Sequence, residues 1–186
     1  LIAAPAGLRK ALNRLIEQET ENAQAGKKAG ITAKFNSLVD PKIIKRLYAA
    51  ADAGVQIDLI VRGVCCLKTG GRENLRVRSI VGRFLEHSRA FVFENDGDPL
   101  VFLSSADWMP RNLDKRVELM FPVEAEELKA RVIASLRDEL RDNCKAWELK
   151  KSGVYRRARR EPPLLNSQEA RVLAPAQPEE DDEPEA

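Results

Sequence analysis

The chain has 186 residues, of which 44% are hydrophobic and 32% are charged, and its formal net charge is +2. This length suits one domain with a sizeable core, and the apolar content excludes a chain that is disordered throughout. No apolar run approaches the roughly 18 residues that a membrane-spanning helix requires, and we expect no signal peptide. The three cysteines form no CxxC pair, which suits a reducing cytoplasm and predicts neither a disulfide framework nor a zinc site.

The first half of the chain alternates predicted strands and helices. A short strand, LIAAP, leads into a helix that starts near residue 7, has leucines at helical spacing and stops at Gly26. The β-branched strand ITAKFNSLV follows, and then a helix over 41–53 that Asp40 caps. The third strand, VQIDLIVRGVCCL, is apolar on both faces apart from Asp58 and Arg62, as in the centre of a parallel sheet. This βαβ pattern predicts an α/β fold with a mixed, mostly parallel sheet flanked by helices.

The second half begins with the loop KTGGREN and the strand LRVRSI. A hairpin follows, with strands RAFVFEN and LVFLSS around a DGDP turn, and then a strand RVELMFPV. An amphipathic helix is predicted over 124–143, and CKAWELKKSGVYRR could add an edge strand.

The C-terminal part differs in composition from the rest. Proline, glutamine and acidic residues dominate from Glu161, so we expect a domain over 1–160 and a disordered, acidic, proline-rich tail over 161–186. Without the terminal EEDDEPEA the chain is noticeably basic, which fits an anionic ligand such as phosphate, nucleotide or nucleic acid. A solvated basic surface with no specific ligand explains the charge equally well.

Arg62 is the first candidate for chemistry, because it follows the most buried predicted strand and directly precedes Gly63. Open α/β sheets bind ligands at the carboxyl ends of their strands, where a guanidinium can place its planar fork against a phosphate. A structural ion pair with Asp58 is the alternative.

His87, the only histidine, is the second candidate. It lies two residues before Arg89, so on a strand both would face the same side, whereas Glu94 has the opposite parity. An imidazole can attack a phosphoryl group or donate a proton to a leaving oxygen, and a neighbouring cation stabilises the charge of the phosphate. An ordinary structural or surface histidine is the alternative.

The stretch SSADWMPRNLDKRVE is the third candidate, because it gathers many hydrogen-bonding side chains between two predicted strands. They are Ser104, Ser105, Asp107, Arg111, Asn112, Arg116 and Glu118. Burying so many polar groups is costly without partners, which favours a ligand over a simple polar turn.

Four of these segments, in this order, resemble one family. AKFNSLVD, IDLIVRGVCCL, SIVGRFLEHSRAFVFEN and LSSADWMPRNLDKRVE are similar to motifs in the C-terminal catalytic domain of bacterial polyphosphate kinase of the first type. The resemblance implies a fold similar to phospholipase D, in which two related halves each contribute a histidine to a shared cleft. His87-Ser88-Arg89 would replace the HxK of phospholipase D, and Glu94 its aspartate. The turn Ser104-Ser105-Ala106-Asp107 would stand for its Gly-Ser-x-Asn.

The resemblance also implies an activity: reversible transfer of the terminal phosphate of ATP to inorganic polyphosphate, with Mg²⁺ present. A phosphohistidine would form in a preceding domain that this chain does not contain. His87 matches the second histidine, an acid/base that contacts the nucleotide phosphates, and Arg62 matches an arginine that binds those phosphates. Further cleft residues are expected at Lys34, Asn36, Arg89, Glu94, Ser105, Asp107, Arg111, Asn112 and Glu118, and no metal ligand is expected in the chain itself.

The resemblance implies ATP or ADP, polyphosphate and the remaining domains of a longer enzyme as partners, and no nucleic acid. The expected location is the cytoplasm, with membrane association as part of the parent enzyme left open. Because half of a two-half site is present, we do not expect the chain to run the full reaction alone. Two alternatives stay open: a phospholipase-D-like phosphodiesterase that acts as a homodimer, and a non-catalytic module that binds polyanions through Arg62, Arg89, Arg111 and Arg116.

Overall fold

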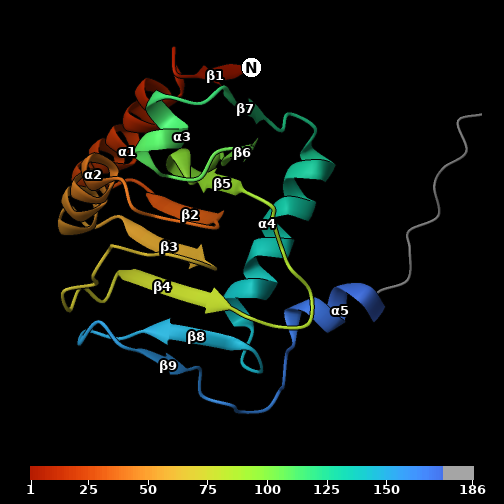
Figure 1. Ribbon diagram of the computed structural model, residues 1–186. Coiled ribbons are helices and arrows are strands. Elements are labelled where there is room, and N and C mark those ends of the chain that lie inside the picture. The colour runs from red at the N-terminus through yellow and green to blue at the C-terminus, as the bar shows by residue number, and fades with distance from the viewer. Residues whose placement is uncertain (174–186) are drawn as a thin grey trace, which may run out of the picture.

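The computed structural model describes residues 1–173, which form one nine-stranded sheet with helices on both faces (Figure 1). The strands are β1 (Ile2–Ala4), β2 (Gly30–Phe35), β3 (Gln56–Val61), β4 (Leu75–Ile80), β5 (Ala90–Phe93), β6 (Leu100–Ser104), β7 (Glu118–Pro122), β8 (Ala146–Leu149) and β9 (Tyr155–Arg157). The helices are α1 (Leu8–Gln24), α2 (Pro41–Asp52), α3 (Pro110–Asp114), α4 (Glu126–Arg141), α5 (Ser167–Leu173) and the 3₁₀ turn η1 (Asn95–Gly97).

The sheet is mixed, as predicted, but it is not mostly parallel. Its strand order is β1-β7-β6-β5-β2-β3-β4-β8-β9. Within the described residues only β2–β3 and β3–β4 are parallel pairs. The expectation was wrong because antiparallel strands flank this parallel centre on both sides: β5, β6 and β7 on one and β8 and β9 on the other. Short turns join β5 to β6 and β8 to β9. A strand that returns through a short turn has to pair antiparallel.

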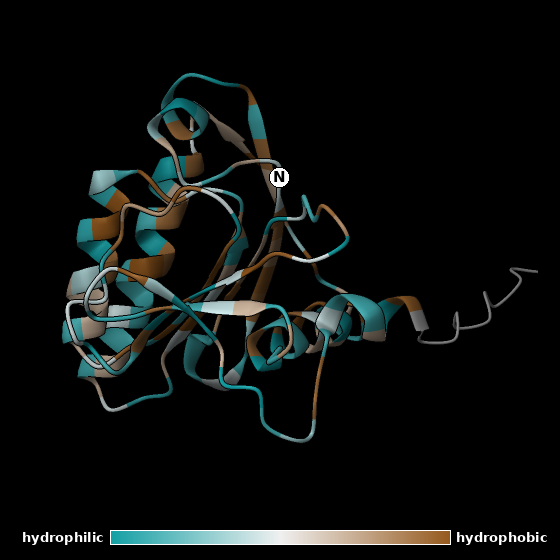
Figure 2. Cartoon of the chain, turned by 60° about the horizontal axis from the view of Figure 1, so that its bottom comes forward, coloured by the Kyte–Doolittle hydropathy of each residue, from teal (hydrophilic) through white to brown (hydrophobic). Residues whose placement is uncertain are grey.

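The alternation of side chains along the central strands separates two layers of core. Ile31 and Phe35 of β2 belong to the cluster under α1 and α2, and Ile60 of β3 belongs to a second cluster with Leu136 of α4. Figure 2 shows hydrophobic residues along the strands and on the sides of α1 and α2 that face them. Trp108 is completely buried and packs at 4.7 Å between ring centroids against Phe35, so it anchors the cluster under α1 and α2.

The local signals for helix ends are confirmed. The side chain of Asp40 accepts hydrogen bonds from the amides of Lys42 and Ile43 at 3.0 and 2.9 Å, which satisfies two free N–H groups at the start of α2. Gly26, just after α1, adopts a φ of 71°, a left-handed conformation that glycine takes without strain.

Three features differ from the sequence-based expectation. A short helix, α3, interrupts the polar stretch before β7, and the predicted edge strand over 144–157 is two strands, β8 and β9. The folded part also extends past the expected boundary at 160: α5 packs against the domain, with Ser167 fully buried. The remaining part of the expected tail, 174–186, lies outside the described residues. None of the helices within residues 1–173 has both the length and the apolar composition needed to cross a membrane.

Candidate functional site

Four strand ends bring polar residues of the candidate site to one edge of the sheet. β2 and β3 run parallel and end there, and Asn36 and Arg62 are the next residues. β6 ends at the same edge, shortly before Asp107. β5 runs in the opposite direction and begins there, directly after His87 and Arg89. This is the edge at which open α/β sheets bind ligands.

A chain of hydrogen bonds joins these five residues. Nε and Nη2 of Arg62 donate to Oδ1 of Asn36 at 3.0 and 2.7 Å. The amide of Asn36 donates to Oδ1 of Asp107 at 2.8 Å, and Nε of Arg89 donates to the same oxygen at 3.1 Å. Nη1 of Arg89 lies 2.9 Å from Nδ1 of His87. This network therefore joins two guanidinium groups and an imidazole to one carboxylate, that of Asp107.

Arg62 is not the partner of Asp58. Asp58 accepts from Nε and Nη2 of Arg76 at 2.6 and 2.9 Å, so that structural alternative for Arg62 is wrong. Among residues 1–173 no carboxylate lies within ion-pair distance of Arg62. Its half-buried guanidinium contacts the neutral oxygen of Asn36 and keeps a positive charge that an anion could neutralise.

The contact with Arg89 determines which ring nitrogen of His87 can donate. A guanidinium has only donors, so the neutral imidazole accepts through Nδ1 and carries its hydrogen on Nε2. The carbonyl of His87 accepts a second bond from the same Nη1 at 2.9 Å. The side chain is exposed, so Nε2–H can donate a hydrogen bond to an anionic oxygen outside the sheet edge.

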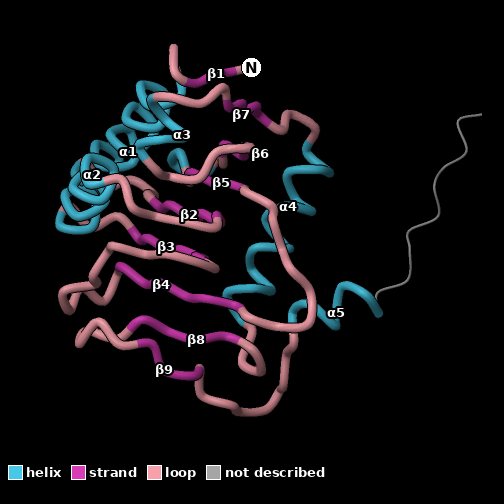
Figure 3. The backbone as a smooth tube through the Cα atoms, in the orientation of Figure 1, coloured by secondary structure: helices cyan, strands magenta, loops and turns pink. Residues whose placement is uncertain are grey.

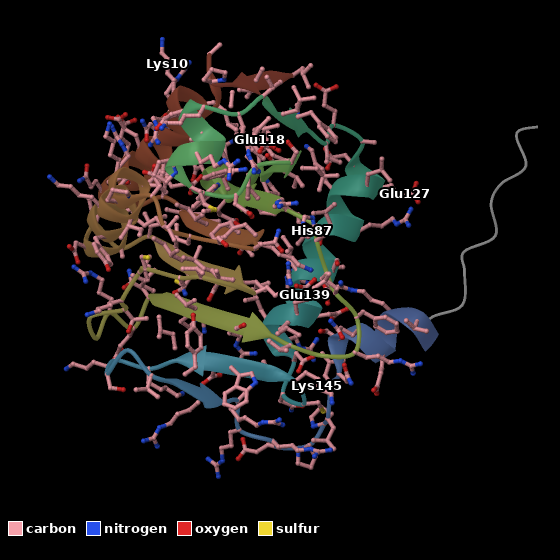
Figure 4. All side chains as sticks on the ribbon, viewed as in Figure 1. Lys10, His87, Glu118, Glu127, Glu139 and Lys145 are labelled. Carbon is pink, nitrogen blue, oxygen red and sulfur yellow. The ribbon has the colours of Figure 1, made fainter. Side chains whose placement is uncertain are left out.

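Lys34, also expected in the cleft, lies in a cluster of two cations and two carboxylates. Its Nζ donates to Oε1 of Glu139 at 2.7 Å and to Oε2 of Glu86. Arg171 donates to the same oxygen of Glu139 at 2.6 Å, and Gln168 to Oε1 of Glu86 at 2.8 Å. Burial raises the pKa of Glu86, but the hydrogen bonds from Lys34 and Gln168 outweigh it and bring the pKa below its ordinary value. Figure 4 shows Glu139 on α4 below His87.

Glu118 forms a separate polar group at the start of β7. It is 8% exposed and accepts from Oγ of Ser105 and Nδ2 of Asn112, both at 2.5 Å. Arg116 approaches within 4.0 Å, whereas Arg111 is exposed on α3. These bonds hold the stretch between β6 and β7 in place. Several of its polar side chains therefore find their hydrogen-bond partners within the chain itself.

Glu94 does not join the site. It follows the last residue of β5, and its amide donates to the carbonyl of Gly30 at 2.9 Å, at the start of β2. Glu94 and His87 thus lie beyond opposite ends of the four-residue strand β5, and therefore at opposite edges of the sheet. The expectation that both belong to one cleft is wrong, because β5 is extended and does not bend back.

A narrow hollow with a cavity volume of about 10 Å³ lies beside the network. Its polar lining is Lys34, Asn36, Arg62, Glu86, Ser88 and Glu139. This space holds about one water molecule, so a larger anion would lie along the edge outside it.

The sequence interpretation missed Glu86, Glu139, Gln168 and Arg171. Glu139 had a readable signal, since an acidic residue three positions after Leu136 lies on the buried stripe of an amphipathic helix. Gln168 and Arg171 had none, because they were assigned to the tail.

The chain matches a family model described as polyphosphate kinase C-terminal domain 2 over residues 1–168. It is 55% identical over 161 residues to a polyphosphate kinase of Pseudomonas syringae pv. tomato, covering 85% of this chain and 22% of that protein. It is 50% identical over 172 residues to polyphosphate kinase 1 of Chlorobaculum tepidum, covering 91% and 25%. The chain thus spans about a quarter of the length of these relatives.

Solved structures agree with this relationship. The crystal structure of polyphosphate kinase from Porphyromonas gingivalis superposes with a TM-score of 0.88 at 41% identity, covering 92% of this chain and 27% of that one. A phospholipase D family member, Nuc from Salmonella typhimurium, superposes with a TM-score of 0.57 at 16% identity, covering 84% and 96%. The latter likeness shows the fold alone and confirms the phospholipase-D-like architecture. The chain belongs to the polyphosphate kinase C-terminal domain 2 family.

Proposed function

We propose that the chain supplies one half of a phosphoryl-transfer site that moves the terminal phosphate of ATP reversibly onto inorganic polyphosphate. The observation that carries this proposal is the hydrogen-bonded network from Arg62 to His87 at one sheet edge. Catalysis of phosphoryl transfer depends mainly on positioning and on neutralising charge on the phosphate oxygens. The guanidinium of Arg62, which has no carboxylate partner among residues 1–173, and the imidazole N–H of His87 suit that task because one hydrogen-bonded network holds both.

His87 acts in this proposal as a hydrogen-bond donor to a phosphate oxygen. Attack on phosphorus requires a lone pair on the exposed nitrogen, but the Arg89 contact directs the lone pair to Nδ1. A role as acid requires a proton on Nδ1 as well, and therefore rotation of the ring away from Arg89. In this proposal the covalent phosphohistidine therefore forms in a preceding domain and not on His87. The remaining domains of the longer enzyme are the proposed partners of this chain, and the proposed location is the cytoplasm.

Mg²⁺ is part of the proposal only as the counter-ion of the nucleotide. Within the described residues no group of three or more His, Cys, Asp or Glu side chains could hold a metal. The carboxylates near the edge already have partners: Asp107 binds Arg89, and Glu118 binds Ser105. These residues do not fit a metal site of their own, so no step is assigned to a protein-bound ion.

Binding is tested on the chain itself by calorimetric titration with tripolyphosphate. Arg62→Ala should weaken binding about 10- to 100-fold, the value of one charge-assisted contact. Arg14→Ala, an exposed arginine on α1, is the matched control and should leave affinity unchanged. Equal losses in both variants would reduce the interaction to non-specific attraction and would reject the proposal.

Activity is tested by placing this chain in the polyphosphate kinase of Pseudomonas syringae pv. tomato in exchange for the matching segment, which is 55% identical. The hybrid should incorporate label from γ-labelled ATP into long polymer, and His87→Ala should slow incorporation about 100- to 1,000-fold, as expected for the loss of one hydrogen-bond donor. Normal incorporation by the His87→Ala hybrid would contradict the assigned role. Hydrolysis of bis-p-nitrophenyl phosphate by the isolated chain would instead favour a phosphodiesterase. Tripolyphosphate binding that Arg62→Ala weakens but His87→Ala leaves unchanged would favour a non-catalytic module that binds polyanions.

A further inference from the structure

The loop over residues 81–89, which carries His87, has no helix or strand of its own. It leaves β4, passes α5 and runs beside α4 to β5 (Figure 3). Val81 and Leu85 are 61% and 76% exposed, so the loop buries little apolar surface that could fix it. Its position depends on polar contacts instead.

Gln168 of α5 supplies these contacts. Its Oε1 accepts from the amide of Phe84 at 3.1 Å, and its Nε2 donates to the carbonyl of Phe84 at 2.9 Å. The same Nε2 donates to Oε1 of Glu86 at 2.8 Å. Gln168 is 5% exposed, so this loop, rather than solvent, satisfies its amide. One side chain thus holds a backbone and a carboxylate within three residues of His87.

Gly82 permits this approach from the side of the loop. A Cβ at position 82 would lie 2.2 Å from Oε1 and 2.9 Å from Cδ of Gln168. A side chain there would push the amide of Gln168 away from Phe84, so the contact requires glycine.

The helix that carries Gln168 is itself anchored. Asp142, which is fully buried at the end of α4, accepts from the amide and the hydroxyl of Ser167 at 2.8 and 2.9 Å. Arg171 adds bonds to the carbonyl of Ser135 at 2.7 Å and to Oε1 of Glu139 at 2.6 Å. Because α5 is tied to α4 at both of its ends, it is a fixed support for the loop.

We propose that α5 positions His87, and that Gln168 is the positioning residue, because it holds the loop backbone that presents the imidazole to Arg89. Glu86 extends the same support to β2 through Lys34. The inference rests on the proposed phosphate-binding role of His87. It adds α5, which sequence composition had assigned to a tail, to the elements that position the site.

The single histidine makes the test direct. In the chain labelled with ¹⁵N-histidine, NMR should show one set of ring signals with Nε2 protonated. Gln168→Ala should broaden or duplicate these signals, because the ring leaves Arg89, and should weaken tripolyphosphate binding at least about fivefold, since fewer molecules are binding-competent. Glu169→Ala, exposed on the same helix, is the matched control and should change neither.

Gly82→Ala tests the same contact from the loop. It should reproduce the ring signals of Gln168→Ala, and the double variant should be no worse than Gln168→Ala, because the colliding amide is gone. Unchanged ring signals in a folded Gln168→Ala chain would overturn the inference. So would a double variant whose loss of binding is the sum of the losses of Gln168→Ala and Gly82→Ala. If Gln168→Ala does not fold, the ring signals of Gly82→Ala decide alone. Ring signals that respond to Gln168→Ala in a chain that binds no tripolyphosphate would reject the proposed function and support the positioning role.

Discussion

Replacing Asp107 by asparagine removes the carboxylate at the centre of the site network. The side chains of Asp107 and Arg89 are 11% and 13% exposed, and they meet at 3.1 Å. The substituted side chain keeps one oxygen for the amide of Asn36, which now donates to Asp107 at 2.8 Å. The guanidinium of Arg89, however, loses its counter-charge while it stays largely buried.

Removing one partner of a buried pair costs about 3–5 kcal/mol of unfolding free energy. The retained oxygen and the residual exposure reduce this loss, so we expect about 2–3 kcal/mol for Asp107→Asn. Arg89→Met removes the charge itself, and the double variant should recover at least about 1 kcal/mol relative to the sum of the single losses.

Urea unfolding followed by circular dichroism measures these differences by linear extrapolation. Asp114→Asn is the matched control, because Asp114 pairs with Arg9 but is 43% exposed, and it should cost less than about 1 kcal/mol. Tripolyphosphate should stabilise Asp107→Asn more than the unsubstituted chain, since an anion can replace the lost charge. If Asp107→Asn lowers the free energy of unfolding no more than Asp114→Asn does, Asp107 and Arg89 are not a buried pair. If the losses of the two single variants add up in the double variant, the pair is not coupled.

Substitutions at three further positions test other parts of the structure. Asp40→Ala removes the cap of α2 and the ion pair with Arg9 at 2.6 Å, and thermal unfolding should show a loss of about 2–4 kcal/mol; a shift typical of a surface site would contradict this. Because the pKa of Glu86 is lowered, its contribution to stability is fully present above pH 4.5 and is lost as the pH falls below that value. Glu86→Gln should therefore make the free energy of unfolding fall less steeply at acid pH. An unchanged fall would contradict the assignment. Trp108→Phe should cost about 1–2 kcal/mol in urea unfolding, against about 3–5 for Trp108→Ala, because the buried indole N–H has no partner among the described residues; equal losses would contradict this.

Sequence patterns predicted most of the elements because the signals are local. Asp40 before a proline and an apolar stripe is sufficient for a helix start. The run of β3, apolar apart from Gln56 and Asp58, is sufficient for a central strand. The same patterns overestimated the parallel share of the sheet. Whether a strand returns parallel or antiparallel depends on the connection, and the second half of the chain contains the hairpins β5–β6 and β8–β9.

The candidate site was predictable to the extent that it follows strand ends and family motifs. Arg62, Asn36, Asp107 and His87 all lie just outside strands at one edge. Glu94 was assigned to the same cleft from its motif spacing, yet an extended strand carries it to the other edge. Spacing along a chain does not determine distance in space unless the backbone conformation between the residues is known.

By itself the sequence determined the family, the succession of strands and helices, and which polar residues emerge at the sheet edge. Only the tertiary structure decided their partners. Asn36 and Asp107 are 71 positions apart, and Lys34 and Glu139 are 105 apart. Burial makes each of these polar groups find a partner, but which partner it finds depends on how the whole sheet and α4 bring distant segments together.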